Sequence, residues 1–156
     1  MDLMIEAMQG RHREILSAFD GLSRTVVADA EGTHSLQLMG FLRHRLLPHM
    51  HCEESELYRS IDRLMARPGA SITATMAMDH ELMEQQIARI DESLNAVTLE
   101  PSFELQHGAP DRNIGFLLAQ FDLVLRLHLR REEHLYLTAF QSYAGDNIAS
   151  DIWRRM

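Results

Sequence analysis

The chain has 156 residues, 46% hydrophobic and 24% charged, so we expect one globular domain spanning residues 1–156. Its formal net charge of −8 argues against a nucleic-acid partner, because phosphate binding requires a basic surface. No run of about 20 apolar residues predicts a membrane span, the acidic N-terminus does not read as a secretory signal, and the single cysteine, Cys52, excludes an internal disulfide, so the default expectation is a cytoplasmic protein.

The first predicted helix covers about residues 5–27. His12 falls inside its apolar stripe, where an imidazole costs desolvation free energy unless its nitrogens have partners. A single histidine of this kind is more often bonded within a core than bound to a metal. The stripe recurs at helical spacing and consists of Ile5, Met8, Ile15, Phe19, Leu22 and Val26.

The second predicted helix covers about residues 34–65 and ends before the breakers at 67–69. Pro48 lies inside it, where it removes a backbone hydrogen bond at a cost of up to about 3 kcal/mol. We therefore expect a kink one turn before His49. The inner face of this helix is predicted to consist of Leu42, Leu46, His49, Glu53, Leu57 and Leu64.

The third and fourth predicted helices cover about residues 71–97 and 112–143, with a breaker-rich connection over roughly 98–111. A short C-terminal helix reaching Trp153 is expected after Gly145. Four amphipathic helices with mostly short connections predict an all-α, antiparallel four-helix bundle. The inner stripe of the third helix is Met76, His80, Met83, Ile87, Ile90 and Leu94, and that of the fourth is Ile114, Leu117, Phe121, Leu125, His128, Glu132, Leu135 and Ala139.

Two segments repeat one pattern, His-x-x-x-Glu-Glu, at His49 to Glu54 and at His128 to Glu133. Residues four apart share a helix face, so each histidine and its first glutamate project to a common point. One such pair is more often a surface hydrogen bond or a weak ion pair. Two copies within the same apolar framework favour metal binding instead, and imidazoles with carboxylates suit iron, manganese or zinc.

The chain also divides into two similar halves. In the first, His12 on one helix precedes His49 and Glu53 on the next, and in the second, His80 precedes His128 and Glu132. In an antiparallel bundle the levels of these residues coincide. The pattern predicts that four histidines and two glutamates from four helices form a ligand set for two metal ions.

With these residues in this order, the sequence resembles hemerythrin-like proteins of the HHE cation-binding family over about residues 8–140. The resemblance implies a non-haem di-iron centre inside a four-helix bundle. His12 and His49 would bind one iron, His80 and His128 the other, and Glu53 and Glu132 would bridge them beside an oxo or hydroxo group. Glu54 and Glu133 turn about 100° away and are expected to support the ligands or line the rim.

One departure from the family pattern bears on function. Oxygen-carrying hemerythrins have a fifth histidine on the third helix, whereas here Met76 and Glu84 stand four positions before and after His80. We therefore expect a sensing or stress-response protein that binds dioxygen, nitric oxide or iron rather than a carrier. The alternative is a redox enzyme or iron-sulfur cluster repair factor. A third interpretation is a metal-free interaction module, and a protein partner or a homodimer stays open.

Several residues near the motif have two interpretations. Glu84 could add a carboxylate to the site but is more often solvated or hydrogen-bonded. Cys52 could take part in redox chemistry but is more often inert packing. Tyr58 and Tyr136 are expected in matching places one turn past the glutamates, where they close the end of the site or bond near it.

The remaining histidines are expected outside the site. His44, His51 and His134 lie off the inward stripes and are predicted to face solvent or a partner. Two Glu-x-x-His motifs, at residues 31–34 and 104–107, match those of ferritin-like bundles. Both fall in connections rather than within amphipathic helices, so a ferritin-like assignment is rejected.

Overall fold

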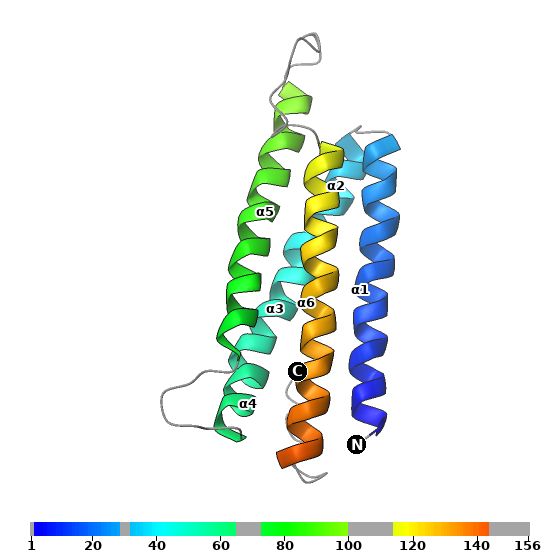
Figure 1. Ribbon diagram of the computed structural model, residues 1–156. Coiled ribbons are helices and arrows are strands. Elements are labelled where there is room, and N and C mark those ends of the chain that lie inside the picture. Colours follow the sequence, from blue (N-terminus) through cyan, green and yellow to red (C-terminus); the bar gives the residue numbers. More distant parts are fainter. Residues whose placement is uncertain (1, 29–31, 65–72, 100–113, 144–156) are drawn as a thin grey trace.

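The computed structural model describes residues 2–28, 32–64, 73–99 and 114–143, and these form four helical columns (Figure 1). The first is α1, Asp2–Ala28, the third is α5, Ala74–Leu99, and the fourth is α6, Ile114–Tyr143. The second column is continuous but changes its hydrogen-bonding pattern along its length. Its segments are α2 (Gly32–Phe41), η1 (Leu42–Leu46), α3 (Leu47–Cys52), η2 (Glu53–Tyr58) and α4 (Arg59–Leu64).

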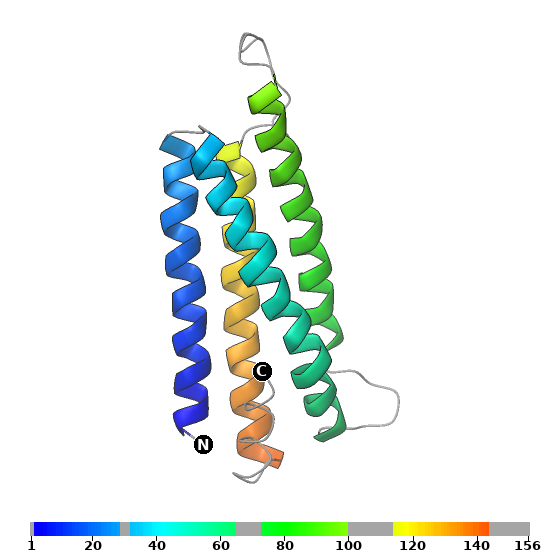
Figure 2. The same cartoon turned by 180° about the vertical axis from the view of Figure 1, so that it is seen from behind.

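The columns alternate in direction, up-down-up-down, which confirms the predicted all-α bundle. Helix α6 packs against both α5 and α1. Figure 2, the view from behind, shows that the second column crosses obliquely over α6, starting beside α1 and ending toward α5. The site residues of all four columns can therefore meet at one level inside the bundle.

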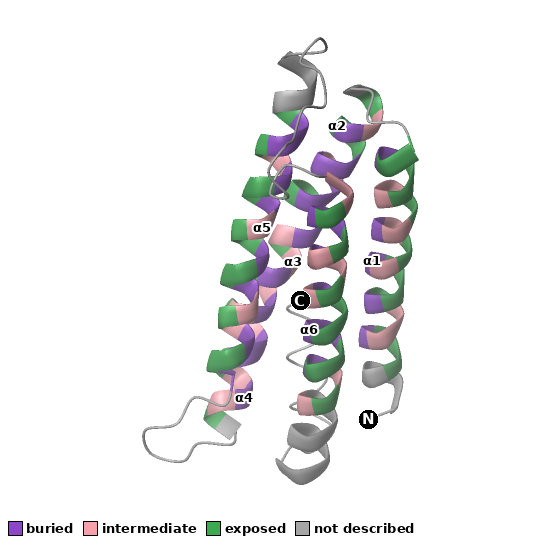
Figure 3. Ribbon diagram, turned by 45° about the horizontal axis from the view of Figure 1, so that its top comes forward, coloured by how far each residue is buried: buried purple, intermediate pink, exposed green. Residues whose placement is uncertain are grey.

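The apolar stripes face inward as the sequence predicts, and exposed residues cover the outer surface (Figure 3). The rings of Phe19 and Phe121 meet with their centroids 5.2 Å apart and form the centre of the core between α1 and α6. Apolar burial of this kind provides most of the driving force for folding. The same core includes Leu38, Leu42, Leu46, Met83, Ile90 and Leu125, each no more than 1% exposed.

The second column contains two π-helical turns, η1 and η2, where backbone bonds span five residues instead of four. In η1 the N–H of Leu47 donates to the carbonyl of Leu42, and Pro48 follows within the first turn of α3. Proline is tolerated at such a position because its missing donor is not needed there. Where the sequence predicts a kink, the structure thus has a π-helical turn.

The helix boundaries agree with the predicted ones to within three residues. The predicted connection at 98–111 and the short C-terminal helix lie almost wholly or wholly outside the described residues. Within the part of the chain that the structure describes, no helix is both long and apolar enough to span a membrane.

Candidate metal centre

All six predicted ligand residues lie in one buried cluster at the level where the four columns meet. His12, Glu53, His80, His128 and Glu132 are each no more than 1% exposed. The side chain of His49 is 9% exposed. Burying two carboxylates and four imidazoles together is costly unless their polar atoms have partners.

The cluster consists of two groups of three residues that share Glu53. In the first group are His12, His49 and Glu53, and in the second are Glu53, His80 and His128, with the donor atoms of each group within 4.8 Å of one another. One oxygen of Glu53, Oε1, lies 2.8 Å from His49 Nε2, and the other, Oε2, lies 3.6 Å from His80 Nε2. Glu53 therefore stands between the two groups.

Glu132 stands between the same two groups from the opposite column. Its Oε2 lies 3.4 Å from His12 Nε2 and 3.8 Å from His128 Nε2. Each carboxylate thus faces histidines from both halves of the chain.

The donor atoms fit cations better than they fit one another. His12 Nε2, His49 Nε2 and both oxygens of Glu53 are buried without a partner in hydrogen-bonding geometry, although His49 Nε2 and Glu53 Oε1 are close. The Nε2 atoms of His80 and His128 lie 3.0 Å apart. Two nitrogens bound at right angles to one cation at about 2.1 Å would lie about 3 Å apart. Nitrogen and carboxylate donors of this kind suit iron, zinc or manganese.

A carboxylate from the other half of the chain holds the outer nitrogen of two of the histidines. His12 Nδ1 lies 3.0 Å from Glu133 Oε1, and His80 Nδ1 lies 2.8 Å from Glu54 Oε1. A carboxylate that accepts the Nδ1–H of a neutral ring leaves the Nε2 lone pair pointing into the cluster. This arrangement confirms that Glu54 and Glu133 support the cluster.

The carboxylate of Asp79 lies near the outer nitrogen of His128, and the sequence did not predict this neighbour. Its Nδ1 lies 3.7 Å from Asp79 Oδ2, and Arg131 holds that carboxylate at 2.8 Å. The sequence indicates this neighbour only in that Asp79 directly precedes His80, a histidine of the inner stripe.

Burial and charge shift the pKa values of the cluster in opposite directions. Burial disfavours the charged form of His12, but the carboxylates of Glu132 and Glu53 outweigh it and raise the pKa of His12 to about 10. Burial and the neighbouring His80 lower the pKa of His128 to about 4. The pKa values of the two glutamates of the cluster, Glu53 and Glu132, also shift in opposite directions.

Burial and the negative charge of Glu53 raise the pKa of Glu132 to about 8. For Glu53, burial acts in the same direction, but His12 and His49 outweigh it and lower its pKa well below the ordinary value. Two carboxylates in one buried site cannot both ionise cheaply. Bound cations would relieve this repulsion.

Tyr58 reaches the cluster through the π-helical turn η2. Its hydroxyl lies 3.2 Å from His80 Nε2, its ring stacks on that of His80 at 5.4 Å, and it is 4% exposed. The expectation that Tyr58 and Tyr136 occupy matching places is wrong by one residue: Tyr58 follows Glu53 by five positions, whereas Tyr136 follows Glu132 by four. The side chain of Tyr136 is outside the described residues.

The other candidate residues lie outside the cluster. Glu84 is exposed and contacts exposed His51 at 2.7 Å, so it is hydrogen-bonded at the surface rather than turned inward. His44 and His134 are also exposed, as predicted. Cys52 is half-buried, and burial together with Glu56 and Glu53 raises its thiol pKa, so it is not activated as a thiolate. Of the two Glu-x-x-His motifs, the one at 104–107 lies outside the described residues, whereas Gly32, Thr33 and His34 of the other begin helix α2, so the prediction that this motif lies in a connection is wrong.

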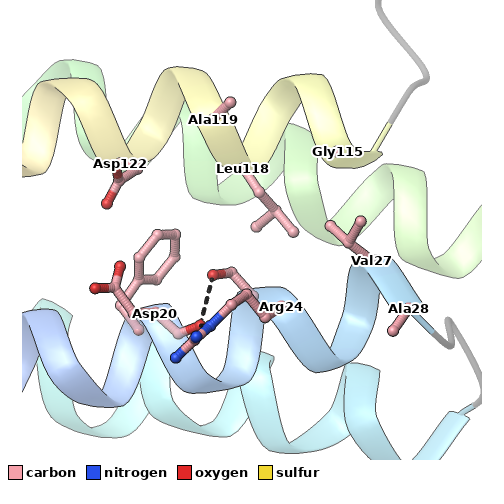
Figure 4. A pocket seen from close by; sticks show the side chains of 10 residues that line it. Asp20, Arg24, Val27, Ala28, Gly115, Leu118, Ala119 and Asp122 are labelled. Carbon is pink, nitrogen blue, oxygen red and sulfur yellow. Dashed lines mark hydrogen bonds between the residues drawn. The ribbon is translucent and has the colours of Figure 1, made fainter.

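A surface groove between α1 and α6 is separate from this cluster (Figure 4). It has a volume of about 520 Å³ and is lined by Phe19, Leu118 and neighbours on the two helices. On α1 it begins at Phe19, about two helical turns beyond His12. Its charged groups are paired, with Arg24 donating to the Asp20 carbonyl and Arg126 bridging Asp20 and Asp122. The described residues that line the groove include no histidine, so it lacks the imidazole donors of the buried cluster.

One family model matches residues 3–140 of the chain, and its description is "Hemerythrin HHE cation binding domain". No curated protein and no solved structure matches the chain. The family match covers every residue of the buried cluster.

Proposed function

The chain belongs to the hemerythrin HHE cation-binding domain family, and on that premise we propose that its buried cluster holds two iron ions. The protein would use them to bind dioxygen or nitric oxide, or to take up iron, in a sensing or stress response. Iron supplies the redox chemistry and the affinity for small diatomic molecules that side chains lack. The cytoplasm is the compartment we propose for this role.

The position of Glu53 is the observation that carries the proposal. A carboxylate shared by two groups of histidines is what a pair of bridged cations requires, and Glu132 faces both groups from the other side. In this assignment His12 and His49 bind one iron, His80 and His128 bind the other, and the two glutamates bridge them. An oxo or hydroxo group would complete the bridge.

The chain's own residues orient and enclose the centre. Glu133 and Glu54 hold the Nδ1 protons of His12 and His80, so the Nε2 lone pairs stay directed inward. The near-complete burial of the ligands keeps bulk water away and admits only small molecules. That burial favours a diatomic ligand over a large substrate.

The second candidate is a redox enzyme or iron-sulfur cluster repair factor that acts through the same centre. The half-exposed carboxylate of Glu54, bound directly to His80, favours this candidate, because it connects the buried donors with the surface. Turnover of dioxygen, nitric oxide or peroxide with an added reductant would distinguish the enzyme from a binding protein.

Metal analysis with visible spectroscopy tests the proposal. The anaerobically reduced protein is measured first, then after dioxygen and after nitric oxide are added. We expect about two irons per chain, as the two donor groups require, and absorption that changes with these gases. Zinc, or no metal at all, would overturn the di-iron assignment. His44→Ala is the matched control, because it removes an exposed histidine and should leave the iron content intact.

A further inference from the structure

The hydroxyl of Tyr58 is a polar group of the centre that the ligand set does not use. It is buried, it lies 3.2 Å from His80 Nε2, and it also interacts with the carboxylate of Glu132. Both of these neighbours are proposed iron ligands on the His80 and His128 side. A buried hydroxyl requires a hydrogen-bond acceptor, because leaving one unsatisfied is costly.

The π-helical turn is the reason why this hydroxyl faces the centre. In a regular α-helix, Tyr58 would point about 140° away from Glu53, since five residues turn the helix by about 500°. In a π-helical turn the backbone bonds join residues five apart, so residues i and i+5 share a face. Glu53 and Tyr58, the first and last residues of η2, are accordingly both buried.

Cation binding would remove one of the two acceptors that the Tyr58 hydroxyl now has. When Glu54 accepts the Nδ1–H of His80, Nε2 keeps a single lone pair, and both the Tyr58 hydroxyl at 3.2 Å and Nε2 of His128 at 3.0 Å face it. A cation bound at Nε2 takes that lone pair. The carboxylate of Glu132 would then divide its oxygens between the two cations and the hydroxyl, so the hydroxyl lies beside the cations with one acceptor fewer.

A surface cleft leads to the same tyrosine. The cleft has a volume of about 420 Å³, lies between η2, α4 and α5, and is lined by Tyr58, Glu54, Asp62 and Thr73, among others. It ends at a side chain that contacts a proposed ligand directly. A small molecule in this cleft therefore lies against Tyr58.

We propose that the Tyr58 hydroxyl donates a hydrogen bond to the small ligand that binds on the His80 and His128 side, and so determines which side is used and which ligands bind well. The ligand class is a small anion or diatomic molecule with a lone pair that can accept this bond. The inference rests on the proposed di-iron function, and it adds the residue that orients the ligand.

Azide binding to the iron-loaded ferric protein tests this role. Wild type, Tyr58→Phe and Ser55→Ala are compared by iron content, by the azide Kd and by the azide stretching frequency in H2O and D2O. We expect Tyr58→Phe to keep its iron, to bind azide about 3- to 10-fold more weakly and to lose the D2O shift that the wild type shows. Ser55→Ala removes an exposed hydroxyl of the same turn and should keep the wild-type Kd and shift.

Four results would overturn the role of Tyr58. They are an unchanged Kd and shift in Tyr58→Phe, an equal effect in Ser55→Ala, the absence of a D2O shift in the wild type itself, or an iron-phenolate absorption that Tyr58→Phe removes. The last would make the tyrosine a ligand. If the wild type holds no iron, the di-iron proposal fails as well, and the metal analysis separates that failure from the others.

Discussion

The column of residues 32–64 and helix α6 carry the same His-x-x-x-Glu-Glu motif, but their backbones differ. Helix α6 is α-helical throughout its 30 residues, whereas the column changes to π-helical bonding at η1 and again at η2. The turn η2 begins at Glu53, so the interruption starts within the motif itself. The same side chains are therefore presented by two different backbones.

The difference shows how one residue changes what surrounds a motif. Between the second glutamate and the tyrosine, the column has three residues, Ser55, Glu56 and Leu57, whereas α6 has only two, His134 and Leu135. The structure accommodates the additional residue as a π-helical turn, which brings Tyr58 to His80. Two segments that carry the same proposed ligands can thus place different side chains around them.

Removing one histidine from each backbone gives the largest expected effect. His49→Ala in the column and His128→Ala in α6 should each lower the iron content toward one metal or none, because each removes a donor from one group of three. Metal analysis of the purified variants measures this. Retention of all iron by either variant, or an equal loss in His44→Ala, would refute the ligand assignment.

The raised pKa values of Glu132 and His12 predict a pH dependence of the stability of the metal-free protein. The pKa of Glu132 is raised from 4.5 to about 8, so as pH rises the unfolded chain releases this proton first and stability falls between these values. The pKa of His12 is raised from 6.5 to about 10, so this residue also lowers the stability as pH rises between those two values.

We therefore expect the chelated protein to be less stable at pH 9 than at pH 6, by on the order of a few kcal/mol. Urea unfolding at several pH values measures the free energy. Glu132→Gln should flatten the part of the dependence between pH 6 and 8, because it removes that titration while keeping the shape of the side chain. A slope unchanged in this variant would contradict the assignment to Glu132.

Deleting Ser55 should have the smallest effect and would make the column resemble α6. The deletion leaves two residues before the tyrosine, as in α6, and returns the turn to α-helical bonding. We expect the bundle to fold and keep its iron, with a loss of about 1–3 kcal/mol from repacking of α4. Circular dichroism and urea unfolding measure this, and failure to fold would show that the column requires the π-helical turn.

The sequence predicted most of the bundle because its helices obey one period. The stripes of α1, α5 and α6 were identified from the 3.6-residue repeat, and the six clustered residues lie on those stripes or on the column's inner face. The contact of Tyr58 could not be predicted in this way, since a π-helical turn breaks the period. Only a residue-by-residue comparison of the two halves exposes the additional position.

The partners of the histidines were only partly predictable. The sequence indicated that Glu54 and Glu133 turn away from the ligands, but which ring each carboxylate would meet depends on how the columns pack. Asp79 was missed because its role depends on Arg131, which lies on another helix. Contacts between columns are not encoded in the spacing of any single helix.

The crossed contacts, Glu133 with His12 and Glu54 with His80, make the two halves of the chain dependent on each other. Each half supplies two histidines and one glutamate to the cluster, but each lacks the carboxylate that orients one of its own rings. If the chain were cleaved between α4 and α5, neither fragment could present a finished site. Metal ions bound by residues of both fragments would then hold the two fragments together, and reassembly of the fragments would depend on the metal.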